Sequence, residues 1–147
     1  MLTEILINLF ERDLSRLEEE IMAYDTEAAI WRIPEGIKNP AGNLVLHLCG
    51  NLQHFTGAIL GKNGYVRQRE LEFSTRDVPR QDLINMIGVT RRVVLTVILG
   101  LAAEDMEKTY PEKVFASEMS TGHFLVHLST HLNYHLGQIN YHRRLTK

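Results

Sequence analysis

Histidines are concentrated at the end of this sequence. Five of the seven lie within the last 25 residues, and four of them are spaced four apart, at His123, His127, His131 and His135. On an α-helix, residues four apart lie on nearly the same face, each step turning by about 40° around the axis. Imidazole is the commonest protein ligand for transition metals, so this spacing indicates a metal site as the chemistry to examine.

The four histidines cannot all face one ion. With His131 as the reference and about 100° per residue, the apolar residues of this segment centre near about 80°. His131 and His135 lie on that side, whereas His127 and His123 turn away from it. His142 also points inward, but it lies almost two turns beyond His135. The spacing therefore predicts that His131 and His135 form the inward pair.

A third ligand has to come from elsewhere, because an open metal site usually takes three protein ligands. His47 and His54 lie on nearly one face of an earlier segment, and His47 is closer to its apolar centre by about 20°. Two plainer interpretations stay open from the residues alone: the HxxxH spacing arises by chance, or His47 is a hydrogen-bonded core residue. Cys49 points about 200° away from His47 and is predicted to be a small buried hydrophobic residue.

Four amphipathic segments would position these residues. Apolar residues recur at helical spacing over residues 3–24, 40–60, 79–103 and 121–145. Asn39 is the predicted N-cap of the second helix, with Pro40 at its first position, and Ser120 is the predicted N-cap of the last. No segment shows a strand pattern, so we expect an all-α four-helix bundle. The three connections are long enough to allow a crossover and do not determine the topology.

Composition excludes several classes of function. The chain has 147 residues, which predicts a single domain over residues 1–147. Its net charge of −2 provides no basic field, so neither nucleic acid nor an anionic membrane is an expected partner. One cysteine allows no disulfide framework, and the chain starts without a basic segment followed by an apolar run. The most apolar run, 93–103, is too short to span a membrane. We therefore expect a cytoplasmic protein.

The acidic residues are unevenly placed. Residues 36–69 and 119–147 contain no Asp or Glu, and these two stretches hold all seven histidines. An HExxH glutamate is absent, so any carboxylate beside the metal must come from the first or third helix or from a loop. Asn51, Gln138 and Tyr134 are the local polar candidates to orient the ligands. Three aromatic residues are predicted to serve in packing: Trp31, Tyr134 and Tyr141.

The last helix resembles that of a known family. Residues 127–139, His-Leu-Ser-Thr-His-Leu-Asn-Tyr-His-Leu-Gly-Gln-Ile, are similar to the H-x-x-x-H-x-x-x-H-x-G-Q-I pattern of the DinB/YfiT-like superfamily. Residues 43–55, which include His47, resemble the second helix of that family. The resemblance implies a four-helix bundle of up-down-down-up topology. It also implies a divalent metal, most often zinc or nickel, held by His47, His131 and His135.

The resemblance also implies a class of function. Members are often homodimers, and characterised relatives include S-transferases that use bacillithiol or glutathione-like thiols, and a mycothiol-dependent isomerase. We therefore expect a metal-dependent S-transferase with a low-molecular-weight thiol, or a hydrolase, acting on a small-molecule electrophile. The alternative is a non-catalytic metal-binding or interaction bundle. A subunit interface is one explanation for the broad apolar face at Val93, Leu95 and Val97.

Overall fold

The computed structural model describes residues 1–147, which form helices and connecting segments without a β-sheet. The long helices are α1 (Leu2–Met22), α3 (Ala41–Leu52) with its π-helical continuation η1 (Gln53–Leu60), α5 (Arg80–Leu99) and α7 (Thr121–Leu145). The short helices are α2 (Glu27–Ile30), α4 (Arg69–Ser74) and α6 (Ala103–Glu107). None of the helices is both long and apolar enough to cross a membrane.

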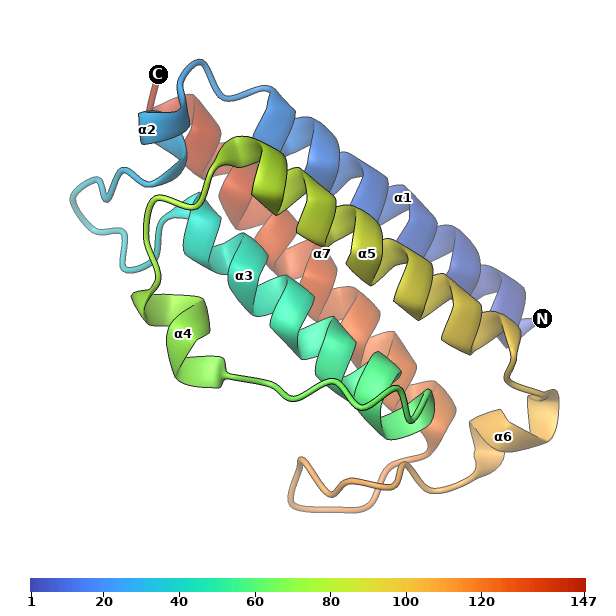
Figure 1. Cartoon of the computed structure of the whole chain (residues 1–147). Coiled ribbons are helices and arrows are strands. Elements are labelled where there is room, and N and C mark those ends of the chain that lie inside the picture. The colour runs from blue at the N-terminus through green and yellow to red at the C-terminus, as the bar shows by residue number, and fades with distance from the viewer.

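The long helices form a bundle whose topology includes one crossover. Helices α1 and α3 each pack against α5 and α7. Helices α1 and α7 run in one direction and α3 and α5 in the other, because the connection 61–79 passes back along α3 before α5 begins (Figure 1). The predicted all-α bundle of up-down-down-up topology is confirmed. As a result, α3 and α7 are antiparallel neighbours.

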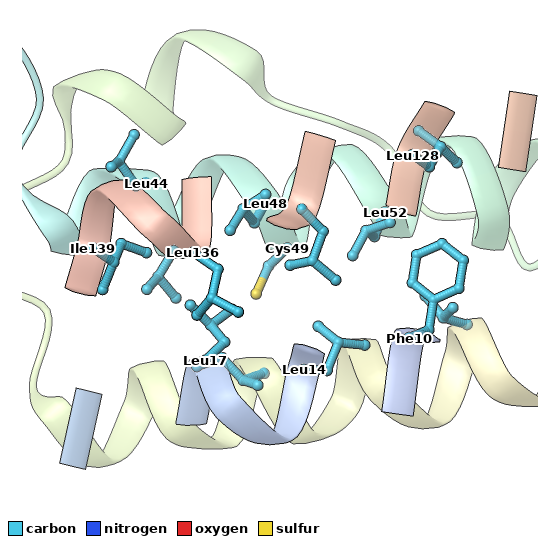
Figure 2. Packing of buried hydrophobic residues seen from close by; sticks show 14 of the residues in the cluster. Phe10, Leu14, Leu17, Leu44, Leu48, Cys49, Leu52, Leu128, Leu136 and Ile139 are labelled. Carbon is cyan, nitrogen blue, oxygen red and sulfur yellow. The ribbon is translucent and has the colours of Figure 1, made fainter. Parts of the chain in front are cut away.

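The core lies between the inward faces of these helices. Figure 2 shows Leu14 and Leu17 of α1 pointing toward Leu48 and Leu52 of α3. These side chains belong to one cluster of 29 buried hydrophobic residues. Cys49 is a member of the cluster, as predicted, and burial raises the pKa of its thiol to about 11. The thiol is therefore protonated at neutral pH and turned away from solvent.

Most predicted helix ends lie close to the observed ones. Helix α7 begins after Ser120, whose hydroxyl accepts a hydrogen bond from the backbone N–H of His123, as the predicted cap requires. Helix α1 ends at Met22, two residues before the predicted end, and Tyr24 beyond it is buried with its hydroxyl 2.7 Å from Nδ1 of His142. The predicted N-cap of α3 is displaced by one residue: Pro40 is itself extended, with φ −69° and ψ 164°, and precedes the first helical residue.

The connections between the four predicted helices contain short helices that were not predicted. Helix α5 ends at Leu99 rather than Ala103, and Ala103 instead begins α6. Helix α4 forms within the connection 61–79 and packs on α3. A hydrophobic repeat cannot indicate such helices, because they are too short to contain more than one or two turns.

Part of the broad apolar face of α5 is covered by another segment of the same chain. Val93 and Val97 lie against glycines of the α3–η1 end: a Cβ on Gly57 would lie 3.0 Å from Val93, and one on Gly61 2.7 Å from Val97. The absence of these side chains lets η1 approach α5 closely. A homodimer interface on α5 stays a prediction.

Candidate metal centre

The antiparallel packing of α3 and α7 brings three histidines together. One ring nitrogen of each of His47, His131 and His135 lies within 4.8 Å of the others. Nε2 of His47 lies 3.2 Å from Nε2 of His131. His47 is buried, whereas His131 and His135 are half-buried, so the cluster lies at the edge of the bundle core. Helix spacing predicted the His131/His135 pair, and the family resemblance implied His47 as the third member.

A buried carboxylate orients the first of these rings. Nδ1 of His47 lies 3.0 Å from Oε1 of Glu72, on α4. Arg67 donates to both oxygens of the same carboxylate, at 2.8 and 2.9 Å. Burial alone would raise the pKa of Glu72, but the hydrogen bonds from His47 and Arg67 hold it below its usual value. An ionised carboxylate only accepts hydrogen bonds, so Nδ1 of His47 donates in this contact, and in the neutral ring Nε2 then presents a lone pair to the cluster.

Close packing of α4 on α3 makes this contact possible. A Cβ on Gly50 would collide with the Glu72 carboxylate, so only glycine leaves room for it there. Asn43 fixes the same helix by donating to the backbone carbonyls of Glu72 and Thr75, at 2.9 and 2.8 Å. Glu72 was not among the residues predicted for the site. The only signal was that Glu70 and Glu72 are the first acids after the first acid-free stretch.

His135 is oriented by a side chain on its own helix. Its Nδ1 lies 2.7 Å from Oε1 of Gln138, whose amide nitrogen in turn donates to the hydroxyl of Tyr134 at 3.2 Å. The amide oxygen of Gln138 can only accept a hydrogen bond, so Nδ1 of His135 carries the proton. Nε2 of the neutral ring then has a free lone pair. Tyr134 and Tyr141 are 64% and 65% exposed, so their predicted packing role is wrong. Trp31 is buried, as predicted.

The third histidine has an unpartnered nitrogen. Nδ1 of His131 is buried and makes no hydrogen bond, and the same holds for Oδ1 of Asn51, one turn after His47 on α3. Burial, with a smaller effect of the neighbouring His135, lowers the pKa of His131 to about 4. Burial also lowers the pKa of His135, despite its hydrogen bond to Gln138. Both rings are therefore neutral at neutral pH, which is the form that binds metal.

These residues fit a divalent transition metal. Two histidine nitrogens that bind one tetrahedral ion at about 2.05 Å lie about 3.3 Å apart. The 3.2 Å between the Nε2 atoms of His47 and His131 agrees with that separation. In His47 and His135, Nδ1 is hydrogen-bonded to Glu72 and to Gln138 respectively. Histidines that bind a metal usually have such a partner for the ring nitrogen that does not bind it. Three imidazoles also leave at least one position open.

The remaining histidines lie outside the cluster. His54 pairs with Glu112 at 3.1 Å, and His127 packs edge-on against Phe115. His123 is exposed, and His142 is buried in a structural role between the Tyr24 hydroxyl at 2.7 Å and the Arg32 carbonyl at 2.8 Å. Of the four histidines spaced four apart on α7, His131 and His135 are therefore in the cluster, and His123 and His127 are outside it, as predicted.

A cavity of about 450 Å³ opens beside the histidines. It lies between the segment 36–39 and the C-terminal half of α7, and His135 and Gln138 form part of its wall. Its volume falls within the range of small-molecule sites. The cluster is therefore next to a space that a ligand can enter.

Known proteins share both the sequence pattern and the fold. The family model of the DinB superfamily matches residues 9–139. The crystal structure of a conserved protein from Enterococcus faecalis superimposes with a TM-score of 0.75 at 17% sequence identity, over 98% of this chain and 96% of that one. At this identity the likeness shows the fold alone. No curated protein matches the sequence.

Proposed function

The chain belongs to the DinB superfamily, and we propose that it is a divalent-metal-dependent enzyme whose metal ligands are His47, His131 and His135. One observation carries this proposal: Glu72 and Gln138 hold the Nδ1 protons of His47 and His135, so that both Nε2 lone pairs face the cluster. Zinc and nickel suit an all-imidazole site.

The cavity favours catalysis over the non-catalytic alternative. A purely structural site is closed by protein ligands, whereas a catalytic site keeps a position for substrate. Here three side chains provide nitrogen ligands, and the cavity reaches one of them, His135. A small molecule can therefore approach the centre from the α7 side.

We infer that the reaction is the transfer of a low-molecular-weight thiol to a small electrophile, with hydrolysis as the second candidate. A divalent ion in such a site supplies a Lewis acid that lowers the pKa of a water or thiol. Glu72 and Gln138 keep the rings in place, and the low pKa of His131 keeps that ring unprotonated. In the transfer, sulfur bonds to the electrophilic carbon and the leaving group departs with its electron pair. The thiol proton passes to solvent, because the cavity wall contains no carboxylate.

The test is turnover by protein loaded with zinc or nickel. Thermal shift first selects a thiol among cysteine, glutathione and bacillithiol, and conjugation to 1-chloro-2,4-dinitrobenzene is then followed by absorbance. We expect turnover that requires both metal and thiol. It should be lost in the His131→Ala/His135→Ala variant and kept in the matched His123→Ala/His127→Ala variant from the same helix.

Other outcomes separate the alternatives. Hydrolysis of an activated ester without thiol would favour the hydrolase. Stoichiometric metal without turnover of either kind would favour the non-catalytic bundle. Assembly as a homodimer and a cytoplasmic location stay predictions from the sequence.

A further inference from the structure

The cavity beside the histidines has an unusual composition. Every residue of its wall comes from one of the two acid-free stretches, 36–69 and 119–147. Three other cavities on the surface each include at least one glutamate: Glu112 and Glu118 in one, Glu72 in another, and Glu19 and Glu20 in the third. The distribution of acids in the sequence thus leaves the wall of this cavity without a carboxylate.

Positive charge lies on the same wall. Lys38 lines the cavity, and none of the ion pairs of the chain involves it. The Arg144 guanidinium stacks on the ring of Tyr141, a further wall residue, at 4.3 Å from the ring centroid. Arg144 is not itself a wall residue, so Lys38 is the cation of the wall, and no carboxylate in the wall pairs with it. An anionic ligand in the cavity would therefore be attracted to Lys38.

The rest of the wall divides into apolar and polar parts. Ile37, Leu44 and Leu145 provide apolar surface. His142 contributes only its ring surface, since both of its nitrogens are bonded within the chain. A ligand with an apolar body and a polar group at each end matches this arrangement. One end would reach Lys38 and the other would reach the cluster at His135.

We infer that the cavity binds a small aliphatic carboxylate whose opposite end carries a metal-coordinating group, with Lys38 holding the carboxylate. This inference rests on the proposed metal-dependent function, since it places one end of the ligand at the histidines. It adds that the substrate or thiol of this enzyme is an acid rather than a neutral compound.

The experiment separates the two ends of the ligand. Zinc-loaded protein is titrated by calorimetry, at low ionic strength, with ω-mercaptoalkanoates of increasing chain length. The uncharged ω-mercaptoalkanamides report on the carboxylate, and the ω-hydroxyalkanoates report on the thiol. Zinc content is measured after each titration. At the best chain length, we expect the acid to bind about fivefold more tightly than its amide.

Variants assign this preference to a residue. Lys38→Met should remove the preference for acid over amide and leave the preference for thiol over hydroxyl. Lys62→Met, an exposed lysine from the same acid-free stretch but outside the cavity, should change neither. Added salt should weaken the acid preference in the wild-type protein.

The contrary outcomes are distinct. Equal binding of acids and amides at every chain length would overturn this inference while the metal-dependent function stands. Survival of the acid preference in Lys38→Met would overturn the role of that lysine. Equal binding of thiols and alcohols, with the acid preference intact, would instead contradict a reactive metal at the inner end.

Discussion

Nε2 of His47 on α3 lies 3.2 Å from Nε2 of His131 on α7, although the two residues are 84 positions apart in the sequence. Both nitrogens belong to buried or half-buried rings, and the low pKa of His131, about 4, keeps that ring neutral. Two facing imidazole nitrogens at this separation suit a shared cation, because each can offer it a lone pair.

The first prediction concerns metal content. Purified wild-type protein should contain about one divalent ion per chain, and the His131→Ala/His135→Ala variant should contain almost none, since two of three ligands are lost. Elemental analysis by mass spectrometry measures both. The His123→Ala/His127→Ala variant controls for histidine content on the same helix and should keep its metal. Equal metal content in all three proteins would contradict the assignment of His131 and His135 as ligands.

The second prediction concerns the carboxylate behind His47. Glu72→Gln should weaken zinc binding about 10- to 100-fold, because the ring loses its charged hydrogen-bond acceptor. Competition with a chromophoric chelator gives the dissociation constant. Glu70→Gln on the same helix changes an exposed carboxylate and should bind zinc like the wild type. An unchanged affinity in Glu72→Gln would mean that Glu72 serves only its ion pair with Arg67.

The third prediction concerns the glycine beneath that carboxylate. Gly50→Ala should weaken zinc binding, because the added methyl group displaces the Glu72 side chain from its bonds to His47 and Arg67. Gly137→Ala is the matched control: no atom lies within 4 Å of the new methyl group, and alanine favours helix by up to about 1 kcal/mol. That variant should keep its zinc affinity and gain stability in urea denaturation. Wild-type affinity in Gly50→Ala would contradict the close approach of α4.

The fourth prediction concerns the stability of the metal-free protein at acidic pH. Burial lowers the pKa of His142 below the ordinary value of 6.5. Below that value the unfolded chain therefore binds a proton that the folded chain does not. The free energy of unfolding should then be highest above pH 6.5 and fall as the pH drops toward the folded-state pKa.

Urea denaturation across this pH range provides the measurement. In His142→Gln the fall should be smaller than in the wild type, because one proton-linked group is gone. Some fall should persist, since burial also lowers the pKa of His131 and His135. His123→Gln changes an exposed ring and should keep the wild-type dependence. An identical pH dependence in wild type and His142→Gln would show that His142 is not one of the linked groups.

Features that depend on local periodicity could be predicted from the order of the residues. The bounds of α7, its cap at Ser120 and the inward position of His131 and His135 follow from helical spacing, which each turn of the helix repeats. The His131–His135 step needs no other part of the chain, because residues four apart are neighbours on any helix. For His47 over His54 the spacing gave only a difference of about 20°, and the family resemblance made the choice; His47 is buried in the structure.

Features that depend on contacts between distant segments could not be predicted in this way and are visible in the folded chain alone. The Glu72–His47 contact spans 25 residues and requires α4 to pack on α3 at Gly50, and no periodic pattern encodes that approach. The exposure of Tyr134 and Tyr141 likewise depends on which face of α7 the neighbouring helices leave uncovered. The cavity joins residues 36–39 to the end of α7, two segments a hundred residues apart, because the bundle places the start of α3 beside the end of α7. Helix periodicity is a property of one segment, whereas these contacts depend on how separate segments are brought together by packing.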